Sequence, residues 1–247
     1  MTCFSKVVEK PGNRAALFCF PYAGSGSSVF TSWRNNILSQ VNVYAYQSPG
    51  KEDRFSEPLT KDWAKITSEA IKNIVAAQHK IIILFGHSLG AIMAYEIAKK
   101  LQLAEMAPST VFFSGCRVPG AKSRMPSISH LPDRDFIREV TKFGGVPQAV
   151  LDEPEIMDIV TPILRNDFRL SETYRDSNPI KLKTNVIVLN GIDDPFIQQN
   201  DLCEWASVAS HKITIKQFKG GHFFLNTDQA NVISYLNATM KRVLAAS

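Results

Sequence analysis

The sequence predicts an α/β fold with a mostly parallel central sheet flanked by helices. Short apolar runs alternate with longer amphipathic stretches, which is the pattern of βαβ units. Residues 81–85 are apolar at every position, as in a central strand covered on both faces. The 247 residues, 45% of them hydrophobic, can bury one sizeable core. We therefore expect residues 1–247 to form a single domain.

The apolar runs mark the expected strands, and the amphipathic stretches mark the helices. The expected strands are residues 15–20, 41–46, 81–85, 111–114, 186–190 and 213–218. One helix is expected to begin with Thr60 as its N-cap and another to follow residue 88. The last helix places one apolar face inward, with Val232, Ile233, Leu236, Met240, Val243 and Leu244.

The alternation breaks between Arg117 and Pro179. This segment is rich in proline and contains short helix-like pieces. A connection of roughly 60 residues is too long for an ordinary loop. We expect residues 117–179 to form a helical lid inserted over the active site, with its helices broken at Pro147, Pro154 and Pro162.

The motif Gly-His-Ser-Leu-Gly at residues 86–90 directly follows the apolar strand and opens a helix. This strand-turn-helix context is that of the nucleophile elbow in the α/β-hydrolase fold. Its glycines permit a tight turn that exposes the serine hydroxyl. The motif predicts Ser88 as the nucleophile and the Leu89 N–H, near the helix N-terminus, as an oxyanion donor.

A serine nucleophile on this fold needs an acid and then a histidine later in the chain. His222 lies between the last expected strand and the last helix, which predicts that it is the general base. The acid should follow the strand 186–190, where Asp193 and Asp194 are neighbours. We favour Asp194, because Pro195 holds it in an extended conformation that suits a reach toward His222. Asp193 is the alternative.

The second oxyanion donor should come from the glycine-rich loop after the first strand, where the backbone can approach a substrate oxygen closely. We predict the Ala23 N–H, with Tyr22 as the alternative. The loop lacks the G-x-G-x-x-G spacing and the lysine of phosphate-binding loops.

Composition excludes several other classes of function. The net charge of +5 is scattered without a basic run, which does not favour nucleic-acid binding. The four cysteines form no cluster with metal-ligand spacing, so no metal is expected. No signal-peptide core and no apolar stretch of about 18 residues is present, so we expect a cytoplasmic protein without a membrane segment.

Six short motifs are spread along nearly the whole chain. They are Phe-Pro-Tyr-Ala-Gly at 20–24, Pro-Gly-Lys-Glu-Asp-Arg-Phe at 49–55, the elbow, Leu-Arg-Asn-Asp-Phe at 164–168, Glu-Thr-Tyr at 172–174 and Gly-Gly-His-Phe-Phe at 220–224. Together these motifs resemble those of the type II thioesterases, which are stand-alone editing hydrolases of nonribosomal peptide and polyketide synthases. Ser25 and Asn166 depart from the family pattern, which often has glycine and alanine there.

The resemblance implies hydrolysis of acyl thioesters on the phosphopantetheine arm of acyl or peptidyl carrier proteins, without a cofactor. We expect a monomer that contacts its carrier transiently. Basic residues in loops near the carboxyl ends of the strands would steer an acidic carrier toward the site, namely Lys51, Arg54, Arg117, Lys122 and Arg124.

Three other functions remain open. The first is a medium-chain acyl-carrier-protein thioesterase of fatty acid synthesis, which shares the fold and most of the motifs. The second is a carboxylesterase or lipase, which the lack of an HGGG-type oxyanion motif disfavours. The third is a non-catalytic binding protein on the same fold.

Overall fold

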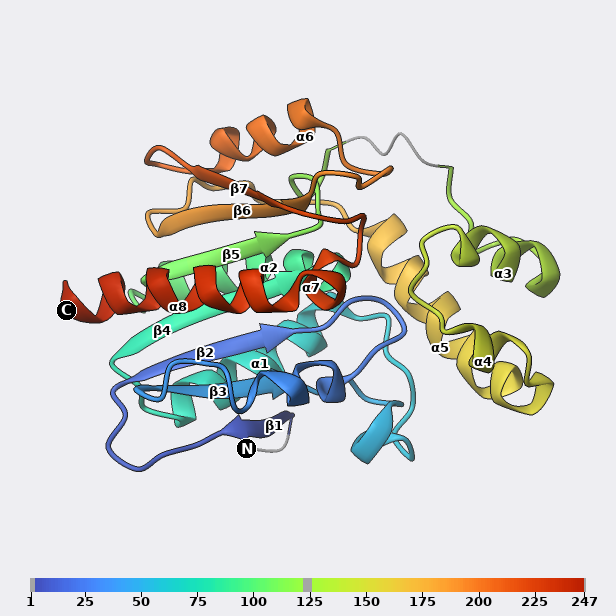
Figure 1. The fold of residues 1–247 in the computed structure, drawn as a ribbon, viewed down its shortest axis with the longest axis horizontal. Coiled ribbons are helices and arrows are strands. Elements are labelled where there is room, and N and C mark those ends of the chain that lie inside the picture. The colour runs from blue at the N-terminus through green and yellow to red at the C-terminus, as the bar shows by residue number, and fades with distance from the viewer. Residues whose placement is uncertain (1–2, 122–125, 247) are drawn as a thin grey trace.

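The computed structural model describes residues 3–121 and 126–246 and contains a seven-stranded sheet of order β1-β3-β2-β4-β5-β6-β7. β1 pairs antiparallel with β3, and the remaining neighbours pair in parallel. The carboxyl ends of the parallel strands therefore meet at one edge of the sheet (Figure 1). The strands are β1 (Phe4–Val8), β2 (Ala15–Phe20), β3 (Val41–Tyr46), β4 (Ile81–His87), β5 (Thr110–Ser114), β6 (Asn185–Gly191) and β7 (Thr214–Phe218).

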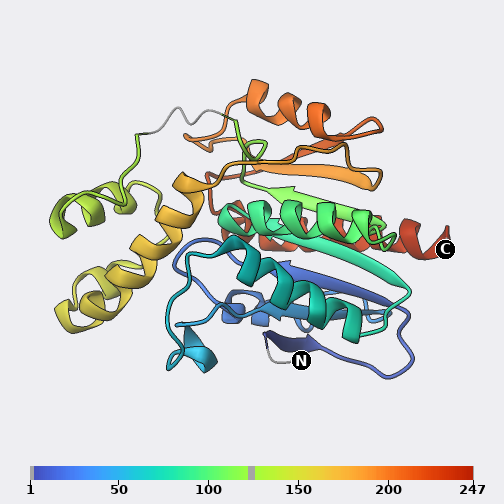
Figure 2. The same cartoon turned by 180° about the vertical axis from the view of Figure 1, so that it is seen from behind.

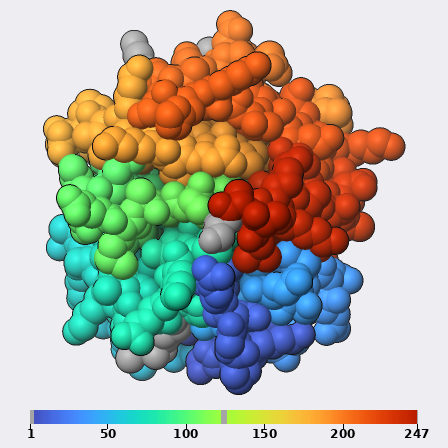
Figure 3. All heavy atoms as spheres, turned by 90° about the vertical axis from the view of Figure 1, so that its left-hand side faces the viewer, coloured from blue at the N-terminus to red at the C-terminus, as the bar shows by residue number. Residues whose placement is uncertain are grey.

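Helices cover both faces of the sheet. One face carries α1 (Trp63–Ala76), α2 (Leu89–Leu103), α6 (Gln199–Glu204) and η3 (Trp205–Val208). The other carries η1 (Ser27–Trp33), α7 (Phe224–Thr227) and α8 (Gln229–Ala245). Figures 1 and 2 show the two faces in turn. Figure 3 shows the end of the molecule that lies opposite the carboxyl edge of the strands. The C-terminal part of α8, in red, extends to this end.

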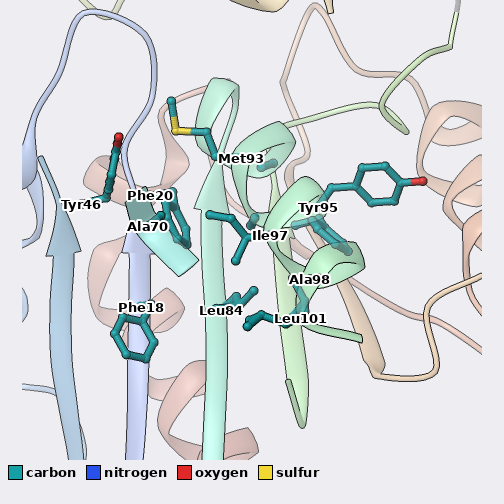
Figure 4. Packing of buried hydrophobic residues seen from close by; sticks show 14 of the residues in the cluster. Phe18, Phe20, Tyr46, Ala70, Leu84, Met93, Tyr95, Ile97, Ala98 and Leu101 are labelled. Atoms are coloured by element: carbon teal, nitrogen blue, oxygen red, sulfur yellow. The ribbon is translucent and has the colours of Figure 1, made fainter. Parts of the chain in front are cut away.

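Burial on both faces explains the uninterrupted apolar strands. Successive residues of β2 alternate between the two cores: Phe18 packs on the side of α1 and α2, and Leu17 packs on the side of α8. Figure 4 shows the first core, where Ile97 and Leu101 of α2 lie against the strands. This packing fixes the carboxyl ends of β2, β4, β6 and β7 relative to one another.

The segment between β5 and β6 forms α3 (Asp133–Thr141), α4 (Gln148–Leu151) and α5 (Pro154–Thr173), which lie beyond the carboxyl edge of the sheet (Figure 1). We call residues 117–179 the insertion. Pro147 is the N-cap of α4 and Pro154 starts α5, so both mark helix starts.

The prediction of a helix break at Pro162 was wrong, because α5 continues through it. A proline inside a helix leaves the carbonyl four residues earlier without its donor, here that of Asp158. Asp158 and Pro162 are both exposed, so water can hydrate that carbonyl. The opposite side of α5 is buried through Leu164, Asp167 and Leu170, which keeps the helix continuous.

Two further details differ from the sequence predictions. β1 was not predicted, because it is a short edge strand in which only Phe4 and Val7 are buried. The N-cap of α1 is Asp62, not Thr60: its side chain accepts hydrogen bonds from the N–H groups of Ala64 at 2.8 Å and Lys65 at 3.1 Å. Among the described residues, no helix is long and apolar enough to cross a membrane.

Candidate active site

The turn between β4 and α2 holds Ser88 in a strained backbone conformation, with φ 55° and ψ −116°. Such a conformation is uncommon for a residue with a side chain, and it persists only where the surroundings impose it. A Cβ atom on Gly86 would lie 2.0 Å from the Gly90 carbonyl oxygen, and one on Gly90 would lie 2.0 Å from that of Phe20. Both motif glycines are therefore required by close packing around the turn. Ser88 itself is half-buried at the carboxyl end of the central strand.

His222 lies in the loop after β7 and contacts the loop after β6. Its Nδ1 donates to Asp194 Oδ2 at 2.8 Å, and both side chains are almost fully buried. The other carboxylate oxygen of Asp194 accepts the Phe196 N–H at 2.9 Å, which fixes the plane of the carboxylate. Of the two aspartates considered from the sequence, the structure brings Asp194 to His222. The Asp193 side chain is exposed, and its N–H donates to the Gly220 carbonyl oxygen at 3.0 Å, which joins the two loops.

His87 connects the serine turn to this pair. It precedes Ser88, is fully buried, and its ring centroid lies 5.2 Å from that of His222. His87 Nδ1 shares a hydrogen bond of 2.8 Å with Ser114 Oγ at the end of β5. Burial, followed by the neighbouring His222, holds the pKa of His87 well below its ordinary value. His87 is therefore neutral at neutral pH and places no positive charge beside His222.

Two N–H groups are candidates for binding a substrate oxygen, one at the start of α2 and one in the loop after β2. Leu89 is the first residue of α2, so its N–H has no acceptor within the helix. In the loop after β2, the Gly24 N–H donates to Asp167 Oδ2 at 2.7 Å and the Ser25 N–H donates to the Tyr22 carbonyl oxygen at 3.2 Å. In the described part of the chain, no hydrogen bond uses the Ala23 N–H. The Ala23 and Leu89 amides are thus available to a substrate oxygen.

Aromatic rings from the insertion and from the loops surround the histidine. Phe143 of the insertion stacks on Phe196 with a centroid distance of 4.0 Å, and both rings contact His222. Phe223 packs edge-on against Tyr22 at 4.9 Å, and a Cβ atom on Gly145 would lie 2.4 Å from its ring. This contact brings the insertion close to the histidine loop. The surroundings of His222 are therefore apolar, which suits the hydrocarbon part of an acyl group.

The prediction that Lys51 belongs to a basic surface that steers the carrier was wrong, because Lys51 is buried and forms an ion pair with Asp167. Arg54 also forms ion pairs, with Glu57 and with Glu69. Both charges are neutralised by carboxylates within the fold. Arg117 is half-buried, and the other two expected residues, Lys122 and Arg124, lie outside the described residues.

The burial of Asp167 and its pairing with Lys51 were not predicted from the sequence. The signal was a carboxylate on the buried face of an amphipathic helix, within the motif Leu-Arg-Asn-Asp-Phe. A charged residue at such a position is rarely buried unless it is paired.

Among the described residues, no group of three or more His, Cys, Asp or Glu side chains could hold a metal ion.

Comparison with known proteins identifies the family of the chain. The family model described as a thioesterase domain matches residues 15–240. The chain is 32% identical to the thioesterase PikA5 of Streptomyces venezuelae over 223 residues, which cover 87% of this chain and 77% of PikA5. It is 29% identical to the medium-chain S-acyl fatty acid synthase thioesterase of Rattus norvegicus over 232 residues, covering 91% of this chain and 87% of that protein.

A solved structure shows the same fold over almost the whole chain. It is that of YbtT, a type II thioesterase from the yersiniabactin NRPS/PKS biosynthetic pathway, with a TM-score of 0.86 and 25% identity. The match covers 95% of this chain and 96% of that one. The chain therefore belongs to the thioesterase domain family and has the α/β-hydrolase fold.

Proposed function

We propose that this chain hydrolyses acyl thioesters held on the phosphopantetheine arm of carrier proteins, as an editing thioesterase of a nonribosomal peptide or polyketide synthase. The observation that carries the proposal is the buried His222–Asp194 pair beside the strained Ser88 turn. Membership of the thioesterase family and the likeness to YbtT support the substrate class.

In the proposed mechanism, Ser88 Oγ attacks the thioester carbonyl carbon while His222 Nε2 accepts the hydroxyl proton. Asp194 holds the imidazole in the required tautomer through its 2.8 Å hydrogen bond and stabilises the imidazolium that forms. The negative charge on the former carbonyl oxygen is stabilised by the Leu89 and Ala23 amides.

The tetrahedral intermediate then collapses and the carbon–sulfur bond breaks. His222 gives its proton to the departing sulfur, which leaves as the thiol. Because a thiol has a pKa of about 8.5, this step needs less acid assistance than release of an amine. A water molecule then gives its proton to His222 and attacks the acyl-enzyme. As the bond between the acyl carbon and Ser88 Oγ breaks, His222 gives this proton to Oγ, which restores the serine hydroxyl and releases the carboxylic acid.

The experiment that tests this proposal is turnover of an acyl-carrier protein by the wild type and by Ser88→Ala. The variant should lose turnover while keeping its fold, because the half-buried hydroxyl fills no core volume. Mass spectrometry of the wild type should detect an acyl adduct on Ser88. An active Ser88→Ala variant would refute the mechanism. Absence of fluorophosphonate labelling in the wild type would favour a non-catalytic binding protein.

The similarity to the rat medium-chain enzyme supports one alternative, a fatty acid synthase thioesterase. Hydrolysis rates over a series of acyl chain lengths separate the two functions. A sharp preference for medium chains would favour the alternative. A preference for short acyl groups, which block carriers, would favour the editing function. We further propose a monomer that acts in the cytoplasm.

A further inference from the structure

A buried ion pair lies beside the loop that carries the Ala23 amide. Asp167 of α5 and Lys51, in the loop after β3, contact each other, and their side chains are only 3% and 5% exposed. An ion pair costs desolvation of both charges, so it does not by itself explain a gain in stability. The contacts that the pair makes with its neighbours point to another role.

Both members of the pair bind the backbone of the same short loop. Asp167 Oδ2 accepts the Gly24 N–H at 2.7 Å, and Lys51 Nζ donates to the Ser25 carbonyl oxygen at 3.1 Å. Leu164, one turn earlier on α5, packs so closely on Gly24 that a Cβ atom there would lie 2.3 Å from Leu164 Cδ2. Two consecutive residues of the loop are therefore held by α5 and by Lys51.

These contacts determine the direction of the Ala23 amide. The Ala23 N–H shares a peptide unit with the Tyr22 carbonyl group, whose oxygen accepts the Ser25 N–H at 3.2 Å and the Ser25 hydroxyl at 2.7 Å. Because the C=O and N–H of a trans peptide point in opposite directions, these bonds turn the Ala23 N–H away from Ser25. Asp167 and Lys51 hold Gly24, which has a φ of +79°, and Ser25 in the positions that keep this turn closed. A group that stabilises a transition state must be held in advance to be effective.

We propose that Asp167 and Lys51 are positioning residues that hold the Ala23 N–H in place to stabilise the oxyanion formed during acyl transfer. This inference rests on the proposed function. It gives a role to the motifs at residues 49–55 and 164–168, which contain Lys51 and Asp167 and lie outside the catalytic loops. It also links the insertion to the oxyanion site, because Asp167 belongs to α5.

The test compares how variants bind a ligand that mimics the oxyanion with how they bind a ligand that has no carbonyl oxygen. In Asp167→Asn we expect kcat on an acyl thioester to fall by about 10- to 100-fold, less than the roughly 10²- to 10³-fold loss on removal of an oxyanion donor, because the Ala23 N–H is displaced and not removed. KM should change by less than about threefold. An alkyl boronic acid, which forms a tetrahedral adduct with Ser88, should bind more weakly by a similar factor. A thioether analogue, which has no carbonyl oxygen, should bind as it does to the wild type.

Asp176→Asn is the matched control. Asp176 also forms a buried ion pair, with Lys99 of α2, and the two side chains are 7% and 6% exposed. It also lies in the insertion, just after α5, and makes no described contact with the loop at residues 22–25. This variant should lose stability as Asp167→Asn does, and should keep both kcat and boronic acid affinity.

If Asp167→Asn fails to fold, the double variant Lys51→Gln with Asp167→Asn leaves no unpaired buried charge and keeps the test open. The inference is refuted if folded variants keep wild-type kcat, if Asp176→Asn loses as much kcat, or if boronic acid and thioether affinities fall together. The proposed function fails separately, if the wild type itself neither hydrolyses acyl thioesters nor binds the boronic acid.

Discussion

At the scale of single residues, the candidate site depends on one choice between neighbours. Asp193 and Asp194 have the same chemistry and similar positions in the sequence, and the structure separates them by burial and by the hydrogen bond to His222. Sequence reasoning could favour Asp194 through Pro195, but it could not show which carboxylate reaches the imidazole. That depends on how the loops after β6 and β7 meet.

Replacing each aspartate in turn should show this difference. We expect Asp194→Asn to reduce kcat by about 10³- to 10⁴-fold, because the imidazole would lose the partner that fixes its tautomer. Asp193→Asn should keep kcat within about threefold, since its side chain is exposed. Steady-state kinetics on one acyl thioester measure both variants. Equal losses would show that the acid lies elsewhere.

His87 leads to a prediction about stability and pH. Its pKa is depressed in the folded state, so below its ordinary value of about 6.5 the unfolded chain binds a proton that the folded chain does not. This contribution therefore destabilises the fold as the pH falls, by up to about 1.4 kcal/mol per pH unit.

The measurement is urea unfolding at about pH 7.5 and about pH 5.5 for the wild type and for His87→Gln. The variant cannot titrate at this position, and its amide can still bond to Ser114. We expect the free energy of unfolding of the wild type to fall more steeply between the two conditions. Parallel losses in the two proteins would show that His87 becomes protonated without unfolding.

At the scale of elements, the sequence predicted the strands well and the helix ends less well. β2 and β3 match the expected ranges because both are buried on both faces, which gives uninterrupted apolar runs. β1 was missed because only two of its five residues, Phe4 and Val7, are buried, which leaves no uninterrupted apolar run. The continuity of α5 through Pro162 depends on packing against the rest of the fold, which local propensity does not contain.

The start of α1 gives a measurable difference between two candidate caps. Asp62→Ala should lower the free energy of unfolding by about 1 kcal/mol, because two N–H groups of the first turn lose their acceptor. Thr60→Ala should cost less, since its hydroxyl accepts only the Asp62 N–H, at 3.2 Å. Chemical denaturation of the two variants checks the order. A larger loss for Thr60→Ala would restore the original sequence prediction.

At the scale of the whole molecule, the proposed carrier partner leads to a prediction about substrate form. We expect kcat/KM for one acyl group to be at least about tenfold higher on its carrier protein than on coenzyme A, because binding energy remote from the thioester can stabilise the transition state. Kinetics with the two donors test it. A ratio near one would indicate a general acyl-thioester hydrolase.

Ionic strength tests the electrostatic part of this expectation. Lys51 and Arg54 are paired within the fold, so they contribute less to steering than their sequence positions suggested. We therefore expect only a moderate fall of the carrier rate with added salt. The sequence could locate these basic residues in loops near the site. It could not show that Lys51 pairs with Asp167, which lies 116 residues later in the chain.

β7, the last strand of the sheet, has a consequence for how folding can be followed. It pairs only with β6 and is largely exposed, yet the loop after it carries His222. Trp33 and Trp205 lie in the two cores on opposite faces of the sheet, so their fluorescence reports collapse of the interior. Recovered enzyme activity instead requires that the outermost strand has docked in register. In a refolding experiment, the delay between the two signals would therefore time the completion of the sheet edge.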